Sequence, residues 1–312
     1  MAIVFSIFIA IFAVVKQKNM HIEDVTIRQL AESHDVTVDY SDDDIVIIDN
    51  VRTLVEPTTA HLKMNLLVIC IAGKAQGTFN GQQTTVGRGN VFICPPNVTF
   101  SDFMMSPDFE FKAMFFTTRI LQAFLREKIS IWNETMYIHR THIVSMSDHD
   151  AAYFSQFYDL LRLCIDNDTQ TPFRMEVIQS LLQAAFVAIC GRMQQMLTDR
   201  PAQVQMRQAD SLFQRFLNLL EQQPVKHRSV ESYAAELCIT PKYLSSVCKK
   251  QSGKTANEWI TQQVLADIRY YLKHTDLSIK QICARMGFPN PSFFGKYVKE
   301  HFGMTPTQLR NS

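Results

Sequence analysis

Residues 229–255 read SVESYAAELCITPKYLSSVCKKQSGKT, and residues 278–305 repeat the pattern as SIKQICARMGFPNPSFFGKYVKEHFGMT. Identical residues recur 49 or 50 positions apart in the two segments. Ser229 aligns with Ser278, Lys249 with Lys299, Gly253 with Gly303 and Thr255 with Thr305. Apolar residues recur at the same offsets. Each copy therefore predicts a short helix, a tight turn and a second helix that ends in basic residues before a glycine.

Helix start signals support this interpretation of the repeat. Ser278 with Gln281 has the spacing of a capping box, as does Thr255 with Glu258. A long helix from Thr255 to His274 is predicted between the copies, because its apolar residues fall on one face. A short helix, a turn and a second helix make up the helix-turn-helix unit, whose first helix holds the second in a major groove of DNA. We expect two such units, at about 229–252 and 278–302.

The second helix of each copy presents hydrogen-bonding or cationic side chains at its outward positions. These candidate DNA-binding residues are Lys242, Tyr243, Ser245, Ser246, Lys249 and Lys250 in the first copy, and Asn290, Ser292, Lys296 and Lys299 in the second. Phe293 is a further candidate in the second copy, although its side chain is apolar. Side chains near the start of such a helix can contact base edges, where Asn pairs with adenine and Lys with guanine. The later lysines are expected to contact phosphate.

Two of these assignments have simpler alternatives. Phe293 could press against a thymine methyl group if it points outward, or be an ordinary core residue if it points inward. The lysines could be a solvated helix end that complements the helix dipole. We favour DNA because the lysines are duplicated within residues 208–312, which hold 14 Lys and Arg against 8 Asp and Glu. Residues 1–207 are acidic, with 17 against 22, and this asymmetry indicates a module that binds a polyanion.

The stretches GFPNPSFFGKYVKEHFGMTP (287–306) and AELCITPKYLSSVCKKQSG (235–253) resemble the DNA-binding domain of the AraC-type transcription regulators. The resemblance covers about 100 residues and implies two helix-turn-helix units joined by a long helix. It also implies double-stranded DNA as partner and control of transcription, as an activator or as a repressor, with RNA polymerase as a possible further partner. We call the second helix of each copy a reading helix. Two departures from the family pattern affect the sequence preference: Gly295 lies within the reading helix of the second copy, and Ser245-Ser246 replace longer side chains in the reading helix of the first.

The N-terminal half alternates short apolar runs with turn residues from Ile45 to about Phe116, which predicts strands. Asn80-Gly81 predicts a tight hairpin turn. Strands at this spacing indicate a small antiparallel barrel or sandwich, and apolar residues at helical spacing in 151–164 and 173–197 predict two helices after it.

The stretch VGRGNVFICPP (86–96) resembles a turn and strand of a cupin-like barrel, the ligand-binding and dimerising domain of many such regulators. The fold class expected is therefore α+β multidomain: an N-terminal cupin-like antiparallel β-barrel with two following helices, and a C-terminal all-α tandem helix-turn-helix domain. The His pair and Glu of the metal-binding cupins do not follow Pro96, so no metal or other cofactor is expected. His139, His142 and His149 could be interpreted as a metal cluster, but no carboxylate or thiol stands at helical ligand spacing from them in the sequence.

A small-molecule effector is a possible ligand of this N-terminal domain. Its Phe- and Met-rich strands could line an apolar pocket or simply form the barrel core, and the residues concerned are Phe100, Phe103, Met104, Met105, Phe109, Phe111, Met114 and Phe115. The rival function is a cupin-type metal-dependent enzyme fused to a helical domain. Nucleophile-elbow, phosphate-loop, zincin and dinucleotide motifs are absent from the sequence, so we expect no enzyme.

The remaining expectations concern location and organisation. Seven widely spaced cysteines without a C-x-x-C motif suggest buried thiols in the cytoplasm. The apolar extension 1–19 is interpreted as a mis-assigned start before Met20, with a membrane anchor as the alternative; its 14-residue apolar run is shorter than the ~20 residues that span a bilayer. We place the effector and dimerisation domain at 20–198, a linker at 199–207 and the DNA-binding domain at 208–312. A homodimer is expected through the helices between about 147 and 198.

Overall fold

The computed structural model describes residues 23–28, 39–49, 60–79, 81–166, 172–199, 208–223 and 229–311. The chain divides into two compact units, residues 1–136 with 140–200 and residues 137–139 with 201–312. The predictions for the extension 1–19, and for the linker apart from Asp199, lie outside the described residues. The domain limits given above stay a prediction.

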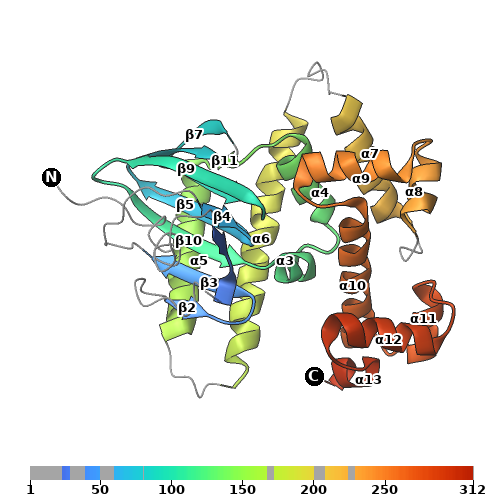
Figure 1. Cartoon of the computed structure of the whole chain (residues 1–312). Helices are drawn as coiled ribbons and strands as arrows, with labels where there is room; N and C mark the ends of the chain where they lie inside the picture. The colour runs from blue at the N-terminus through green and yellow to red at the C-terminus, as the bar shows by residue number, and fades with distance from the viewer. Residues whose placement is uncertain are drawn as a thin grey trace. The chain divides into compact units, whose positions relative to one another are not determined.

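The N-terminal unit is built on two sheets (Figure 1). The first has the strand order β1-β4-β9-β6-β7, with β1 at Glu23–Val25, β4 at Ala60–Leu62, β9 at Val98–Met105, β6 at Lys74–Phe79 and β7 at Gln82–Gly87. The second has the order β11-β8-β5-β10-β3-β2, with β11 at Ile143–Ser145, β8 at Asn90–Cys94, β5 at Asn65–Ala72, β10 at Glu110–Phe116, β3 at Ile45–Asp49 and β2 at Tyr40–Ser41. Every pairing among these strands is antiparallel except that of β1 with β4.

The predicted hairpin joins β6 and β7. Their register runs from Lys74 opposite Gly87 to Phe79 opposite Gln82, which leaves two residues for the turn. Gly81 has φ +80°, the left-handed conformation that such a turn requires. Asn80 itself is outside the described residues.

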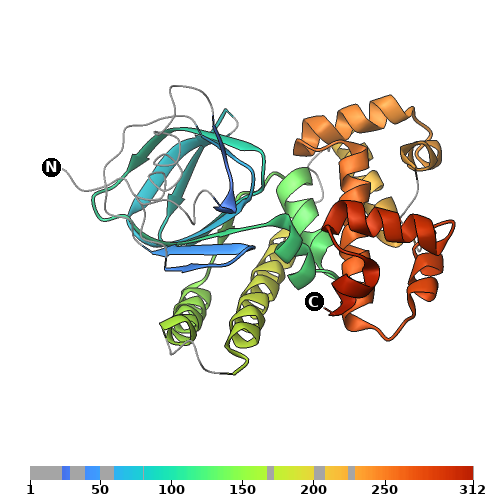
Figure 2. The ribbon, with the colours of Figure 1, turned by 60° about the horizontal axis from the view of Figure 1, so that its bottom comes forward.

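The expected α+β class and antiparallel N-terminal unit are confirmed, but the barrel is not closed. Hydrogen-bonded pairing among the described strands stays within each of the two sheets (Figure 2). The register shifts between Gln76 and Thr78 where β6 meets β9, and between Glu110 and Phe111 where β10 meets β5. Such irregularities bend a strand and increase its twist.

Helices follow β10 along the chain: α3 at Thr118–Phe124, α4 at Ile129–Asn133, the π-helical turn η1 at Glu134–Ile138, α5 at Asp148–Asp166 and α6 at Arg174–Thr198. They belong to this unit, except that the last two residues of η1 are counted with the C-terminal unit. The predicted pair corresponds to α5 and α6, whereas α3, α4 and η1 were not predicted. Phe116, Trp132 and Phe186 form an aromatic cluster that joins β10, α4 and α6, with the Phe116 and Phe186 ring centroids 4.8 Å apart. All three side chains are fully buried, so this cluster fixes α6 on the six-stranded sheet.

The C-terminal unit is helical throughout its described residues, with α7 at Gln208–Gln222, α8 at Val230–Glu236, α9 at Pro241–Ser252, α10 at Ala256–His274, α11 at Ile279–Arg285, α12 at Pro291–Phe302 and α13 at Pro306–Asn311. The predicted connecting helix is α10. Its apolar face is buried, with Trp259, Ile260 and Val264 each no more than 5% exposed. In Figure 1, α9 and α12 lie at the two ends of α10.

No helix in the described part of the chain is long and apolar enough to cross a membrane. All seven cysteines are free thiols. Burial raises the pKa of the Cys190 and Cys248 thiols to about 12, and that of Cys70 to about 11. These thiols therefore remain protonated and unreactive at neutral pH.

Candidate DNA interface

The first helices of the two copies, α8 and α11, begin with the same cap. Ser229 and Ser278 accept hydrogen bonds from the backbone N–H three residues ahead, and Ser278 completes a capping box with Gln281. A capping side chain satisfies a backbone donor that the helix leaves unpaired. The start of each unit is therefore determined by local sequence, as predicted.

The turns between the helices are also equivalent. Cys238 and Gly287 stand at the same place in the repeat and both have left-handed backbones, with φ +57° and +76°. In each turn this residue donates its N–H to a carbonyl three residues back, at 3.0 Å for Cys238 and 3.1 Å for Gly287. Glycine adopts this conformation freely and cysteine does not. The first unit therefore carries a strained residue where the second carries a relaxed one.

The second helices, α9 and α12, have identical lengths of 12 residues and matching ends. Thr240 and Asn290 cap their N-termini, each followed by proline. Gly253 and Gly303 end them with (φ, ψ) of (73°, −4°) and (70°, −3°). This agreement shows that both copies form the same structure.

Each second helix buries one face and exposes the other. Leu244, Val247 and Cys248 are buried in α9, while Phe294 and Val298 are buried in α12. The Phe294 ring packs edge-on against Phe288 with centroids 5.2 Å apart. The buried face thus holds each second helix against its own first helix and turn, and the opposite face is open to solvent.

The candidate DNA-binding residues lie on the open faces. Ten are exposed, and only Ser245 is partly buried: the exposed ones are Lys242, Tyr243, Ser246, Lys249, Lys250, Asn290, Ser292, Phe293, Lys296 and Lys299. Phe293 is 61% exposed and Tyr243 is 49% exposed. The alternative that placed Phe293 in the core is therefore wrong.

Asn290 has a structural role that the sequence interpretation did not assign. Its Oδ1 accepts the Phe293 N–H at 3.0 Å, which makes it the N-cap of α12. An Asn that pairs with adenine uses both its carbonyl oxygen and its amide group. The cap already uses one acceptor position of Asn290 Oδ1, so the amide N–H₂ group is the part of this side chain that the cap leaves available to a base.

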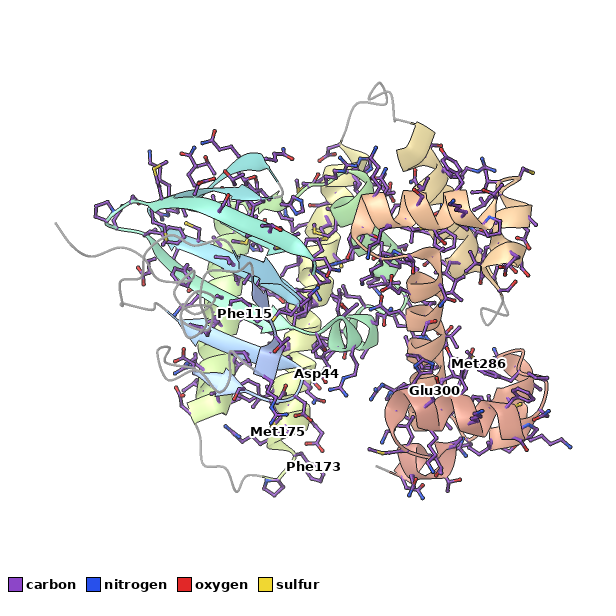
Figure 3. All side chains as sticks on the ribbon, viewed as in Figure 1. Asp44, Phe115, Phe173, Met175, Met286 and Glu300 are labelled. Atoms are coloured by element: carbon purple, nitrogen blue, oxygen red, sulfur yellow. The ribbon has the colours of Figure 1, made fainter. Side chains whose placement is uncertain are left out.

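One exposed residue of this face was overlooked. Glu300 lies on α12 (Figure 3) and aligns with Lys250 of α9. A carboxylate there repels phosphate, so the second helix has the less basic face of the two. The repeat alignment carries this signal, because it places an acidic residue opposite a basic one.

The long helix α10 is anchored to both units. At its start Trp259 donates its Nε1–H to Ser252 Oγ of α9 at 2.8 Å. At its end Arg285 of α11 donates to the Tyr271 hydroxyl at 3.0 Å, and Arg269 lies over the Phe302 ring of α12 at 4.9 Å. These contacts fix the positions of α9 and α12 relative to α10.

Residues 233–312 match the family described as a helix-turn-helix domain. The C-terminal region therefore carries a helix-turn-helix domain, as the repeat predicted. The regulatory protein PocR of Salmonella typhimurium is 29% identical over 101 residues, which are 32% of this chain and 33% of PocR. The transcriptional activator RhaR of Salmonella schwarzengrund is 24% identical over 146 residues, 47% of this chain and 50% of RhaR. The chain thus matches about a third to a half of the length of these relatives.

Among solved structures, the chain is similar to apo ToxT from Vibrio cholerae, at 11% identity with a TM-score of 0.34 over 86% of this chain and 97% of that one. It is also similar to the DNA-binding domain of AdpA in complex with a target DNA, at 17% identity with a TM-score of 0.29 over 32% and 89%. Both scores describe a loose likeness only. The assignment of the C-terminal region rests on the family match and on the duplicated geometry.

Proposed function

We propose that this protein is a sequence-specific transcription regulator that binds double-stranded DNA through α9 and α12. The observation that carries the proposal is the duplication of one helix-turn-helix geometry, with matching caps, turns and ends and with polar or cationic open faces. Phosphate-binding lysines supply affinity, and the N-terminal residues of each helix supply sequence preference.

The geometry of α10 supports binding to successive major grooves. Its 19 residues span ~28 Å at ~1.5 Å per residue, and the major groove recurs on one face of DNA every ~34 Å. The helices α9 and α12 run in roughly the same direction in Figures 1 and 2. One chain therefore covers about two turns of DNA, and its site is asymmetric because the two open faces differ.

A homodimer through α5 and α6 is part of the proposal. These neighbouring helices leave large apolar side chains exposed, among them Tyr153, Leu160, Leu163, Phe173, Met175, Val177 and Val187. Phe173 and Met175 project from the start of α6 (Figure 3). The stripe of Val177, Leu181, Ala184 and Ala188 lies away from the buried face of α6, so the unit's own sheets do not cover it completely. A second copy of this chain would bury it and raise the affinity for paired sites by avidity.

The N-terminal unit is the proposed sensor. Its β9 and β10 carry a mixture of buried and exposed apolar residues: Phe111 and Phe115 are buried, while Met104 is 60% exposed. A small apolar effector bound there would regulate DNA binding by changing how the two chains of the dimer are held. The role of activator, contact with RNA polymerase and a cytoplasmic location belong to the same proposal. The free thiols of the chain fit a reducing compartment.

The comparisons give no support to the rival function, a metal-dependent enzyme. No group of three His, Cys, Asp or Glu within the described ranges is arranged to hold a metal ion. His142 places Nδ1 3.1 Å from the Ile93 carbonyl oxygen, and burial lowers its pKa. Of the relatives named above, PocR is described as a regulatory protein and RhaR as a transcriptional activator.

The proposal is tested by selecting duplexes from genomic fragments with the full-length protein, and then measuring transcripts of the neighbouring genes in a deletion strain. Enrichment of a common asymmetric sequence next to genes with altered transcription supports it. Recovery of fragments without a common sequence contradicts it.

A further inference from the structure

Phe293 is the most exposed aromatic side chain of the reading helices, and it has no hydrogen-bonding group. A single exposed apolar residue needs no special explanation on a protein surface. Here, however, the feature is duplicated: Tyr243 occupies the equivalent place in α9 and is also about half exposed. Two aromatic rings at one position of a repeated unit indicate a shared task.

The position of the two rings is set by the helix caps. Phe293 and Tyr243 are each the third residue after the N-cap, and their backbone N–H groups donate to the cap, at 3.0 Å to Asn290 Oδ1 and 3.2 Å to Thr240 Oγ1. The cap fixes the first turn and therefore the direction of the side chain. Residues in the first turn of a reading helix are those that contact base edges in the major groove.

The chemistry of a phenyl ring selects one feature of those base edges. Phenylalanine cannot read a base by hydrogen bonding, whereas the thymine C5-methyl group is the apolar feature of the major groove. The neighbouring Ser292 and Lys296, also on the open face, can serve the polar contacts around it. A ring held at this place strengthens binding, because it removes from water a methyl group that would otherwise stay exposed.

We propose that Phe293 and Tyr243 each read the C5-methyl group of a pyrimidine, so that the site requires two such methyl groups about one helical turn apart. This inference rests on the proposed function and specifies the ligand of the same face. The ring of Phe293 supplies contact alone, while the hydroxyl of Tyr243 can add a hydrogen bond. Cytosine methylated at C5 presents the same group as thymine and satisfies the same contact.

The test uses full-length protein and its selected duplex, in which each thymine is replaced in turn by deoxyuridine, which lacks only the methyl group. Two replacements about ten base pairs apart should each weaken binding about 4-fold, the equivalent of ~0.8 kcal/mol for one buried methyl group. In Phe293→Ala one of these two effects should disappear, and in Tyr243→Ala the other. Tyr243→Phe should keep both.

Ser292→Ala is the matched control, because Ser292 is exposed beside Phe293 but has no ring. Loss of its hydroxyl should weaken binding to thymine and deoxyuridine duplexes alike, so both deoxyuridine effects should keep their wild-type size. Trp259 fluorescence verifies that each variant is folded. At the position read by Phe293, cytosine should bind more weakly than 5-methylcytosine in the wild type and equally in Phe293→Ala. Deoxyuridine effects that persist unchanged in Phe293→Ala and Tyr243→Ala overturn the inference while DNA binding stands. Absence of salt-sensitive duplex binding by the wild type overturns both.

Discussion

The turn of the first helix-turn-helix unit predicts a gain in stability from a single substitution. Cys238 is exposed and has φ +57°, whereas its counterpart Gly287 has φ +76°. Changing Cys238 to Gly removes the steric conflict between Cβ and the backbone without removing a buried contact. The C-terminal unit should therefore become more stable in Cys238→Gly.

The size of the gain follows from two opposing terms. A residue with a Cβ in the left-handed conformation costs ~1–2 kcal/mol relative to glycine. Glycine in turn gives the unfolded chain extra freedom, worth ~0.4–1 kcal/mol. The difference is a stabilisation of about 1 kcal/mol, or roughly fivefold in the ratio of folded to unfolded protein. Gly287→Ala reverses both terms and should destabilise by about the same amount.

The chain offers a specific probe for this measurement. It contains two tryptophans, Trp132 and Trp259, and Trp259 lies in α10, where it is 5% exposed. In a Trp132→Phe background, fluorescence during urea unfolding therefore reports the C-terminal unit. The midpoint should rise in Cys238→Gly and fall in Gly287→Ala with unchanged slope. Equal destabilisation by both substitutions would refute the reasoning, since it would show that the Cys238 side chain makes contacts that outweigh its strain.

Three further predictions concern charge and assembly. Lys299→Ala should weaken binding to all duplexes alike, and titration at several salt concentrations should show that the slope of log affinity against log salt falls by about one unit. Lys242→Ala should instead cost ~1–3 kcal/mol of binding free energy on the preferred site and little on random DNA. If the two variants behave alike on both DNAs, this division of roles is refuted. Val177→Glu should convert a dimer into a monomer in sedimentation, and a monomeric wild type at micromolar concentration, with and without DNA, would contradict the dimer. Burial lowers the pKa of Lys254 from 10.5 to about 8, against the opposing effect of Glu258. Between these two pH values the unfolded state therefore binds more protons than the folded state. The stability of the C-terminal unit should consequently rise from about pH 8 to 10.5. Trp259 fluorescence measures this rise, which should be absent in Lys254→Met.

The C-terminal domain could be derived from sequence because its signals are local. The capping boxes at Thr255 and Ser278 depend on residues three apart and are present in the structure. Each of these local signals occurs twice in the sequence, because every cap in one copy of the repeat has a counterpart in the other. Asn290 is the exception: its type suggested a base contact, and only the position of its Oδ1 at 3.0 Å from the Phe293 nitrogen revealed the cap.

The N-terminal unit was less predictable because tertiary contacts decide it. The short helices α3 and α4 have only 7 and 5 residues, too few for a periodic apolar pattern. They are held by buried side chains such as Trp132, whose ring partners lie on β10 and α6. The strand pairing is also irregular in places, for example between Gln76 and Thr78. No residue pattern along a single strand reports such a shift.

The central claim, that one chain reads duplex DNA with two equivalent helices, is tested most directly by hydroxyl-radical footprinting of the full-length protein on its selected site. Protection of two patches on one face, separated by about one helical turn, is expected for each bound chain. Gly295→Arg in α12 has room for a side chain, since a Cβ at this position would have no neighbouring atom within 4 Å, and it should change only the patch covered by the second unit. A footprint of a single turn, with Lys242→Ala and Lys299→Ala acting on the same patch, would contradict the account.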